Sequence, residues 1–271
     1  MNARLGLIAA VGVAIVLYVV GVGAVVILVV QGSAPLRGAT GGPRASSTTP
    51  ASRLVTRNTP LAASTGTVVF KDDFHDVYTG WDTVSTTTDI KYSLSNGALV
   101  TVATGGFWFS EPSPYFESLQ QLSVGATATL DIHTPPDAGF GVDCARGSGA
   151  SQTIYQFTAA ADSNWSVMRW TGPDSVTSVP TTLKEGTIRG KPAPGQIPVT
   201  LVGICATMAD GLTTRLAFFI DGSKVADLTD ASPVASPDGW LADLVTAGSD
   251  SGPVTVTVTH FDERDLSRSG P

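Results

Sequence analysis

The sequence predicts an all-β fold, an antiparallel two-sheet sandwich that follows one N-terminal transmembrane helix and a disordered linker. Three observations predict it. The chain opens with a long uncharged apolar run, continues through a stretch rich in Gly, Pro, Ser and Thr, and then alternates apolar and polar residues with a period of two. A period of two is typical of strands with one buried face, whereas an amphipathic helix has a period of about 3.6 residues.

The first element is the apolar run Leu5–Val30, which has 26 residues, carries no charge and follows a short tail at residues 1–4. As a helix it would be about 39 Å long, more than the roughly 30 Å of the hydrocarbon layer. A secretory signal has a shorter apolar core of about 7–15 residues. No cysteine lies directly after the run, where lipoprotein processing would need one. We therefore expect an uncleaved, single-pass anchor in the lipid bilayer.

Two conflicting signals bear on the side of the membrane that the rest of the chain occupies. Arg4 and the terminal amine precede the helix, and Arg37 and Arg44 follow it, so the positive-inside rule gives a tie or favours a cytoplasmic C-terminus. The only cysteines, Cys144 and Cys205, could instead close a disulfide, which persists only in an oxidising compartment. Two unrelated buried thiols are the alternative. Because long domains translocate largely regardless of loop charge, we expect a cytoplasmic N-terminus and an extracytoplasmic C-terminal domain at the cell membrane.

One face of the predicted helix carries small residues at a spacing of four, followed by a hydroxyl: Gly6, Ala10, Ala14 and Tyr18. Small residues let two helix backbones approach closely, and a phenol in hydrocarbon gains from a partner acceptor. This row therefore predicts contact with a helix of another membrane protein. Ala and Gly are also frequent in simple anchors, so a plain tether is the alternative.

Residues 31–66 form the predicted linker, in which 20 of 36 residues are Gly, Pro, Ser or Thr and none is acidic. So few apolar residues cannot offset the entropy of ordering, and we expect no secondary structure. The four arginines of this segment could rest against anionic lipid head groups, or the segment could be a merely soluble spacer.

The predicted β-sandwich covers residues 67–266, and residues 267–271 form a tail. From residue 67 onward the chain carries 11 Lys and Arg residues against 23 Asp and Glu residues, a net charge of −12. Nucleic-acid binding needs a clustered cationic face. The sequence shows no such face, so we expect no nucleic-acid partner.

The strands of this domain show themselves by alternation and by turn chemistry. Segments 125–132 and 254–259 alternate apolar and polar residues, with Ala126, Ala128, Leu130 and Ile132 on one face of the former. Asn96-Gly97 and Asp221-Gly222 predict two hairpins with type I′ turns. Segment 199–206 is apolar on both faces, which predicts a central strand, and the Pro- and Gly-rich segment 172–195 predicts one long surface excursion. Ten to thirteen strand candidates indicate a two-sheet sandwich.

The order of motifs resembles that of a known family. The segment from Phe70 to Trp81 contains Asp-Asp-Phe, a short loop and Gly-Trp, and is similar to the opening of concanavalin A-like, laminin-G-like jelly-roll domains found outside the membrane in actinobacteria. Further similar segments follow in order at residues 92–102, 139–146, 154–157, 162–169, 202–205, 219–222 and 261–262. The sequence departs from the pattern at Ala145, which separates Cys144 from Arg146, and in the length of the 172–195 segment. The resemblance implies a jelly-roll sandwich with both cysteines in place.

The same fold hosts glycosidases, lectins, sensor domains and structural modules, so the site chemistry must decide the function. A glycosidase needs two carboxylates that flank the scissile bond. The chain has four glutamates and no Glu-x-Asp-x-x-Glu strand, and its three histidines lack metal-ligand spacing. We therefore expect no enzyme, with a divergent jelly-roll glycan hydrolase as the alternative.

A group of carboxylates would meet if the first and last strands pair: Asp72, Asp73, Asp76, Asp262 and Asp265. Oxygen-rich clusters suit Ca²⁺, the one cofactor that the sequence suggests. Loop turns capped by local hydrogen bonds explain these residues equally well.

Aromatic residues form the remaining candidate site: Trp108, Phe109, Tyr115, Trp165, Trp170 and Trp240. Exposed rings stack on sugars or anchor protein interfaces, whereas buried rings would fill the core of the sandwich. The expected function is therefore a non-catalytic binding or scaffolding module, an accessory subunit or sensor that contacts envelope glycans or a partner membrane protein.

Overall fold

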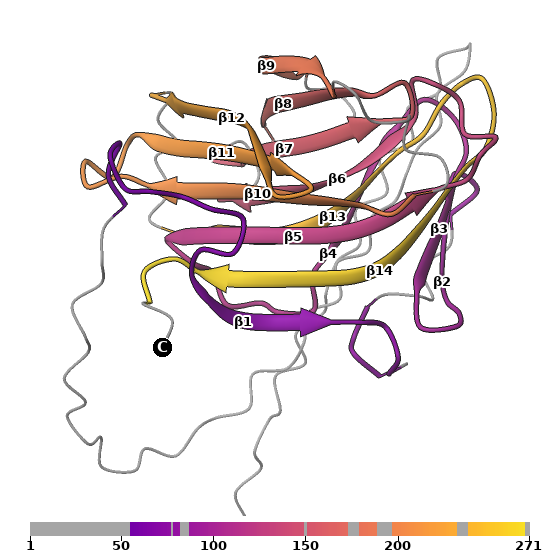
Figure 1. The fold of residues 1–271 in the computed structure, drawn as a ribbon, viewed down its shortest axis with the longest axis horizontal. Helices are drawn as coiled ribbons and strands as arrows, with labels where there is room; N and C mark the ends of the chain where they lie inside the picture. Colours follow the sequence, from indigo (N-terminus) through magenta and orange to yellow (C-terminus); the bar gives the residue numbers. More distant parts are fainter. Residues whose placement is uncertain are drawn as a thin grey trace, which may run out of the picture. The chain divides into compact units, whose positions relative to one another are not determined.

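The domain is a sandwich of two antiparallel sheets (Figure 1). The computed structural model describes residues 55–76, 78–81, 87–148, 151–172, 179–188, 197–231 and 238–268. The predicted membrane helix and its row Gly6, Ala10, Ala14 and Tyr18 lie outside these ranges. Within them, no helix is long and apolar enough to cross a membrane.

The first sheet, called sheet A, contains eight strands of the described chain. Their order across the sheet is β12 (Ser223–Asp230), β11 (Thr214–Ile220), β10 (Val199–Thr207), β5 (Gln121–Leu130), β14 (Val254–Asp265), β3 (Leu99–Ala103) and β2 (Ile90–Leu94), with β1 (Thr67–Asp72) also paired to β14. The pairing of β1 with β14 confirms the expected contact between the first and last strands.

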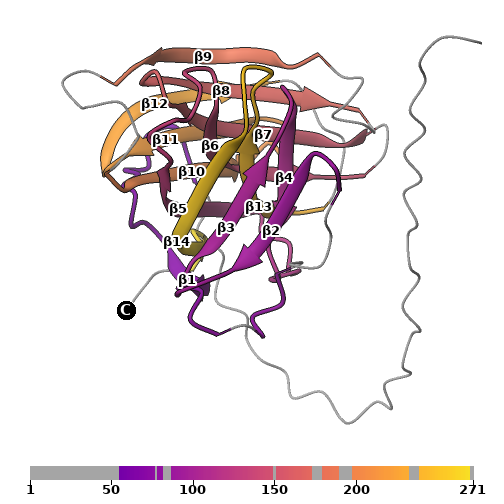
Figure 2. The same ribbon diagram turned by 90° about the vertical axis from the view of Figure 1, so that its right-hand side faces the viewer.

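The second sheet, called sheet B, contains six strands of the described chain and packs against sheet A (Figure 2). Their order is β4 (Trp108–Pro112), β13 (Leu241–Ala247), β6 (Gly139–Arg146), β7 (Thr153–Ala160), β8 (Asn164–Thr171) and β9 (Thr181–Thr187).

Both predicted hairpins are confirmed. Asn96 and Gly97 have φ angles of 54° and 71° between β2 and β3. Asp221 and Gly222 have φ angles of 48° and 75° between β11 and β12. Positive φ at both central residues defines a type I′ turn, whose twist matches that of the flanking strands.

Of the predictions for segments 199–206 and 172–195, the first is confirmed and the second is wrong in part. The predicted central strand is confirmed, because β10 lies between β5 and β11 and is buried along its length. The prediction of one surface excursion over residues 172–195 is wrong at β9, which pairs with β8. As an edge strand with the largely exposed sequence Thr-Thr-Leu-Lys-Glu-Gly-Thr, β9 carries no clear apolar pattern.

Ile132 also differs from expectation, since it lies beyond the end of β5 and is 56% exposed. Asp131 ends the strand by forming a turn: its carboxylate accepts a hydrogen bond from the His133 amide at 2.8 Å, and its carbonyl accepts one from the Thr134 amide at 3.0 Å. The turn removes Ile132 from the buried face.

The main core lies between the sheets and is filled by residues that alternate along the strands, including Leu122, Val124, Phe140, Phe157 and Phe218. At Gly203 of β10 the sheets approach so closely that a β-carbon would lie 2.4 Å from Cδ2 of Phe157 on β7. Glycine is therefore required there for the packing of one sheet on the other.

A segment before the predicted domain boundary also packs on the domain. Val55 and Leu61 are buried in a second apolar cluster on the other face of sheet A, with Val202, Ile204, Ala206, Ala217, Phe219 and Leu266. Arg215 holds this segment, because its Nη1 donates to the carbonyls of Thr56 and Thr59 at 2.7 Å each. Residues 55–66, here called the strap, therefore belong to the packed domain, which starts before the expected boundary at residue 67.

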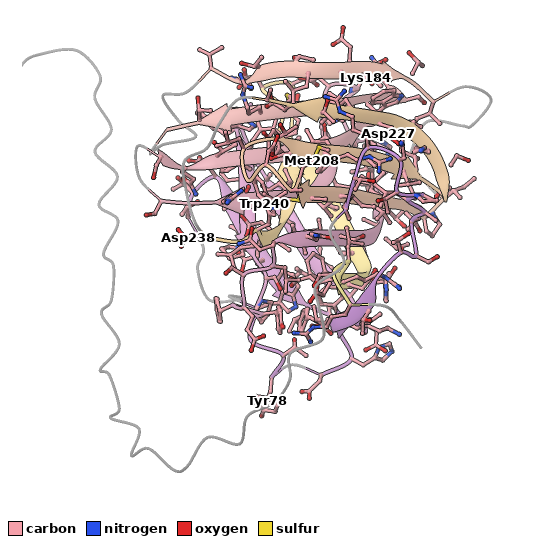
Figure 3. The ribbon with its side chains drawn as sticks, turned by 90° about the vertical axis from the view of Figure 1, so that its left-hand side faces the viewer. Tyr78, Lys184, Met208, Asp227, Asp238 and Trp240 are labelled. Atoms are coloured by element: carbon pink, nitrogen blue, oxygen red, sulfur yellow. A yellow bond between two sulfur atoms is a disulfide. The ribbon has the colours of Figure 1, made fainter. Side chains whose placement is uncertain are left out.

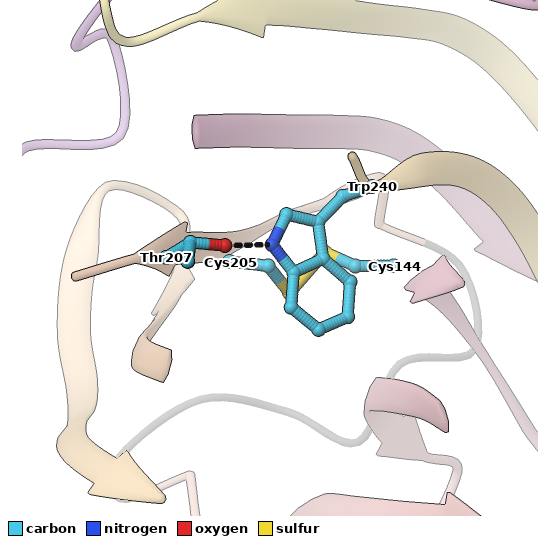
Figure 4. Close-up of a disulfide and its surroundings, with 4 residues drawn as sticks. All are labelled: Cys144, Cys205, Thr207 and Trp240. Atoms are coloured by element: carbon cyan, nitrogen blue, oxygen red, sulfur yellow. Dashed lines mark hydrogen bonds between the residues drawn. A yellow bond between two sulfur atoms is a disulfide. The ribbon is translucent and has the colours of Figure 1, made fainter. Parts of the chain in front are cut away.

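The predicted disulfide is confirmed. Cys144 of β6 and Cys205 of β10 have their Cα atoms 6.4 Å apart and link sheet B to sheet A. The indole of Trp240 lies beside the bond and donates from Nε1 to Thr207 Oγ1 at 3.1 Å (Figure 4). The guanidinium of Arg146 lies 5.3 Å from the centre of the indole ring. The bond is thus enclosed by the core.

Candidate functional site

The outer face of sheet B is the candidate site, and the strand register shows how it is hollowed. Residues of adjacent strands that are directly opposite one another form rows across the sheet. One row is Trp108, Ala247, Gly139 and Ala160, and the next is Ser110, Val245, Gly141, Thr158, Ser166 and Glu185. The central members are small, so the middle of the face is lower than its edges.

A groove with a cavity of about 440 Å³ occupies this position. Its described lining residues come from all six strands of sheet B and from two connecting turns: Trp108, Asp137, Gly139, Thr158, Ala159, Ala160, Asp162, Asn164, Trp165, Ser166, Glu185, Gly186, Thr187 and Ala247. The groove thus reaches from edge strand β4 to edge strand β9, five strand spacings or about 24 Å along the curved sheet.

Polar groups at the β7–β8 turn are held in fixed positions. The carboxylate of Asp162 accepts from the backbone amide of Asn164 at 2.9 Å and from its side-chain Nδ2 at 2.6 Å. Thr187 of β9 donates to Asn164 Oδ1 at 3.2 Å. Ser163 adopts a φ of 71°, a left-handed conformation that turns the chain here. The turn therefore presents an ordered amide and carboxylate at the groove.

The other polar lining residues differ in how much of their hydrogen-bonding capacity is already used by other groups of the domain. The hydroxyls of Thr158 and Ser166 are 2.9 Å apart and bond to each other across β7 and β8. Asp137 accepts from Ser249 Oγ at 2.8 Å through one oxygen. Glu185 makes no hydrogen bond or ion pair within the described residues. Hydroxyl, amide and carboxylate groups next to a half-buried indole can together bind the hydroxyls and apolar faces of sugar rings.

A pair of neighbouring carboxyls, one buried and one half-buried, lies in the next row of the same face. Asp143 of β6 and Asp243 of β13 are direct neighbours in the register, and Ser110 Oγ donates to Asp143 Oδ2 at 2.9 Å. Burial, followed by the nearby Asp243 carboxylate, raises the pKa of Asp143 well above its usual range. Burial likewise raises the pKa of Asp243 to about 6. The pair therefore holds a proton more readily than exposed carboxyls do.

Glu263 of β14 is another buried acid, 1% exposed, and accepts a hydrogen bond from Ser113 Oγ. The pKa of Glu263 is raised to about 7, mainly by burial and to a smaller extent by the carboxylates of Asp243 and Asp262, against the lowering effect of the Ser113 hydrogen bond. The domain therefore contains acids that titrate near neutral pH.

The Asp143–Asp243 geometry differs from that of a glycosidase pair. Asp143 and Asp243 are direct neighbours across β6 and β13, whereas glycosidase carboxylates are about 5–9.5 Å apart with the sugar between them. Asp143 is also fully buried. This arrangement can store a proton but leaves no room for a scissile bond between the two groups.

The predicted calcium ligands all have partners of their own. Asp72 accepts from the Phe74 amide at 2.6 Å and from Trp81 Nε1 at 2.7 Å. The others bond locally: Asp73 with His75, Asp76 with the Tyr78 amide, Asp262 with Arg264, and Asp265 with Ser267 and Arg268. Among the residues that the structure describes, no three His, Cys, Asp or Glu side chains form a metal-binding group. Calcium binding stays a prediction.

The predicted aromatic residues fall into two groups. Trp108 and Trp165 line the groove, although Trp165 is 8% exposed and packs edge-on against Phe218. The other four do not line it: Phe109 packs on the core, Tyr115 stacks on Phe70, Trp170 lies on the outer face of sheet B but is buried and donates to Gln156, and Trp240 is fully buried. Trp240 also appears inside the domain in Figure 3. Of the six, Trp108 is the aromatic side chain best placed to meet a ligand in the groove.

Several polar residues of this face were not identified from the sequence: the groove residues Asp137, Asp162, Asn164 and Glu185, and the neighbouring Asp143–Asp243 pair. The alternating glycines Gly139 and Gly141 in an otherwise apolar strand were a usable signal, because they mark a strand without side chains on one face. Nothing in the sequence indicated that Asp143 and Asp243, 100 residues apart, are paired.

No family model and no curated protein matches the chain. Among solved structures, it is similar to one from a study of endo-acting O-glycanases with which members of the human gut microbiota initiate mucin breakdown, at a TM-score of 0.50 and 11% identity, over 74% of this chain and 100% of the other. The carbohydrate-binding module CBM66 of Bacillus subtilis matches at a TM-score of 0.47 and 15% identity, over 69% and 96% of the two chains. The alginate lyase Aly36B matches at 0.48 and 8%, over 66% and 85%. Such identities bear on the fold alone, a β-sandwich consistent with the predicted jelly roll.

Proposed function

We propose that this chain is a membrane-anchored, extracytoplasmic glycan-binding module of the laminin-G-like type, without catalytic activity. Its N-terminal helix would hold it in the bilayer and could contact a partner membrane protein through Gly6, Ala10, Ala14 and Tyr18. The groove on the outer face of sheet B would bind the glycan. An accessory or sensor role at the cell envelope follows from this combination.

The groove is the observation that carries the proposal. It spans the sheet from β4 to β9, a length of about 24 Å that suits a chain of several sugars better than a single ring. Trp108 offers a ring face at one edge, and Asn164, Asp162 and Glu185 offer polar atoms toward the other. Because sugars combine apolar faces with hydroxyl edges, this mixture of groups matches them.

A glycan hydrolase is the second candidate, favoured by the neighbouring acids Asp143 and Asp243 on the same face. A raised pKa is typical of a general acid at an active site. Against this reading, Asp143 has no exposed surface, and the two residues are direct neighbours in the register rather than placed on either side of a bound sugar. Binding without hydrolysis therefore fits the geometry better.

A glycan panel tests the proposal. The full chain in detergent is presented with β-glucan, xylan, mannan and hexosamine oligosaccharides, and binding is compared between the wild type, Trp108→Ala and Phe116→Ala. Phe116 is 78% exposed and lies outside the groove lining, which makes it a matched control. We expect at least one oligosaccharide to bind, with affinity falling about tenfold, or about 1.4 kcal/mol, for Trp108→Ala only.

Two outcomes would overturn the proposal. Equal binding by the wild type and Trp108→Ala would place the glycan elsewhere. Release of shorter oligosaccharides during incubation, abolished by Asp243→Asn, would establish the hydrolase instead.

A further inference from the structure

The charge of the groove distinguishes among the glycans that it could hold. Three described lining residues are carboxylates, Asp137, Asp162 and Glu185. None of the described lining residues is Lys, Arg or His. The groove is therefore negatively charged, and no cationic side chain among its described lining residues neutralises that charge.

Glu185 faces the groove because of the register of β9. It lies opposite Ser166, a groove residue, whereas its neighbours Lys184 and Gly186 lie opposite Val167 and Trp165, which face the core. Successive residues of a strand point to opposite faces, so Lys184 cannot cover Glu185 from the same side. Figure 3 shows Lys184 at the outer edge of the sheet.

Two of the three carboxylates keep acceptor capacity for a ligand. Both oxygens of Asp162 accept bonds from Asn164, so this residue contributes mainly its charge. Asp137 uses one oxygen for Ser249, and its other oxygen makes no hydrogen bond within the described residues. Neither carboxylate oxygen of Glu185 makes a hydrogen bond within the described residues, so both can accept one from a ligand.

The chemistry of the ligand follows from these charges. A neutral sugar would strip water from the carboxylates without replacing the lost solvation by an opposite charge, which is costly. A sugar carboxylate would add repulsion. An ammonium group would form charge-assisted hydrogen bonds to Asp137 or Glu185, and it is also attracted to an indole face such as that of Trp108.

We propose that the groove binds a glycan that carries free amino groups, a polymer of fully or partly de-N-acetylated hexosamine, in preference to its N-acetylated or uronic-acid counterparts. This inference rests on the proposed function, since it names the sugar class that the same groove takes.

Paired tetrasaccharides test it with the full chain in detergent. The probes are β-1,4-linked glucosamine tetrasaccharide, its N-acetylated form and tetragalacturonate, at about pH 6, where amines are protonated. Affinities are measured by calorimetry at about 20 mM and about 300 mM salt for the wild type, Trp108→Ala, Glu185→Gln and Glu117→Gln. Glu117→Gln removes the same charge from an exposed carboxylate outside the groove and serves as the matched control.

The expected result is glucosamine tetrasaccharide binding at least about fivefold more tightly than its N-acetylated form at low salt. The ratio should fall toward one at high salt and with Glu185→Gln, and stay unchanged with Glu117→Gln, while tetragalacturonate does not bind. Equal affinity for the two hexosamine probes, with both still dependent on Trp108, would overturn this inference and leave the glycan-binding proposal standing. Binding of no probe in a Trp108-dependent way, together with a negative glycan panel, would overturn both.

Discussion

Asp143 and Asp243 lie directly opposite each other on β6 and β13, where Asp143 is fully buried and Asp243 is half-buried. Two adjacent carboxyls cannot both ionise without repulsion, so the pair retains a proton. Ser110 bonds one of them, and Glu263 contributes a further buried acid nearby. The domain therefore binds protons more tightly when folded than when unfolded.

The free energy of unfolding should consequently fall as the pH rises. The pKa of Glu263 is raised from 4.5 to about 7, so the stabilisation is complete below about pH 4.5 and is lost as the pH rises through about 7. For this one group the change is about 3 kcal/mol. Chemical denaturation between about pH 5 and about pH 8 measures it.

Glu263→Gln provides the control, because the amide cannot ionise and its oxygen can still accept the bond from Ser113. This variant should be more stable than the wild type near pH 8 and nearly equal to it near pH 5. Parallel stability curves for the two proteins would contradict the role given to Glu263.

Arg215 should hold the strap to sheet A. It is 5% exposed, bonds two strap carbonyls and pairs with Asp227, which Figure 3 labels. Asp227 is partly exposed, so the main loss is that of the charged hydrogen bonds to the strap carbonyls, about 1.5–3 kcal/mol, and Arg215→Met should destabilise the domain and speed hydrogen exchange in residues 55–66.

Lys224→Met is the matched comparison, since Lys224 binds the same Asp227 carboxylate at 2.7 Å but is 41% exposed in its side chain. An exposed pair contributes about 1 kcal/mol or less. Equal effects of the two variants would show that the strap does not depend on Arg215.

Gly203→Ala should destabilise the domain by about 1–3 kcal/mol, because its β-carbon would collide with the Phe157 ring between the sheets. Gly252→Ala is the control, since its β-carbon would meet Pro135 Cγ only at 3.9 Å. Thermal unfolding of both variants decides the matter, and a tolerated Gly203→Ala would mean that the sheets can separate at no cost.

The Cys144–Cys205 bond closes a loop with a sequence separation of 61 residues. In the chain-entropy model such a loop contributes about 4 kcal/mol. Cys144→Ala with Cys205→Ala should therefore lower the free energy of unfolding by up to that amount, and adding reductant should affect the wild type but not the double variant. Labelling of both thiols in unreduced protein would contradict the bond.

Local chemistry made much of the fold predictable. Asn96-Gly97 and Asp221-Gly222 determine their turns whatever surrounds them, and segment 199–206 is apolar enough to be recognised as central. Strand β9 was not predicted from the sequence. It is an edge strand, which pairs with a neighbour on one side only and can be largely polar. The packing of the strap was not predicted because its anchor, Arg215, lies 156 and 159 residues away in the sequence from the two carbonyls that it binds.

The site was less predictable than the fold. Trp108 was identified by residue type, but so were Trp240 and Trp170, and only their burial separates them. Glu185 of β9, Asp162 of the β7–β8 turn and Asp137 before β6 line one groove because their strands lie close together in sheet B, which composition cannot reveal. Such residues can be assigned to one site only when it is known which strands pair and which of their residues lie opposite each other.

Hydrogen exchange with the tightest-binding oligosaccharide tests the central claim, that the outer face of sheet B binds glycan. The account predicts that the ligand slows exchange in the turn and strands that border the groove, β7, β8 and β9, and leaves β11 and β12 of sheet A unchanged in the same sample. Slower exchange confined to sheet A or to the strap, with β7–β9 unchanged, would contradict it.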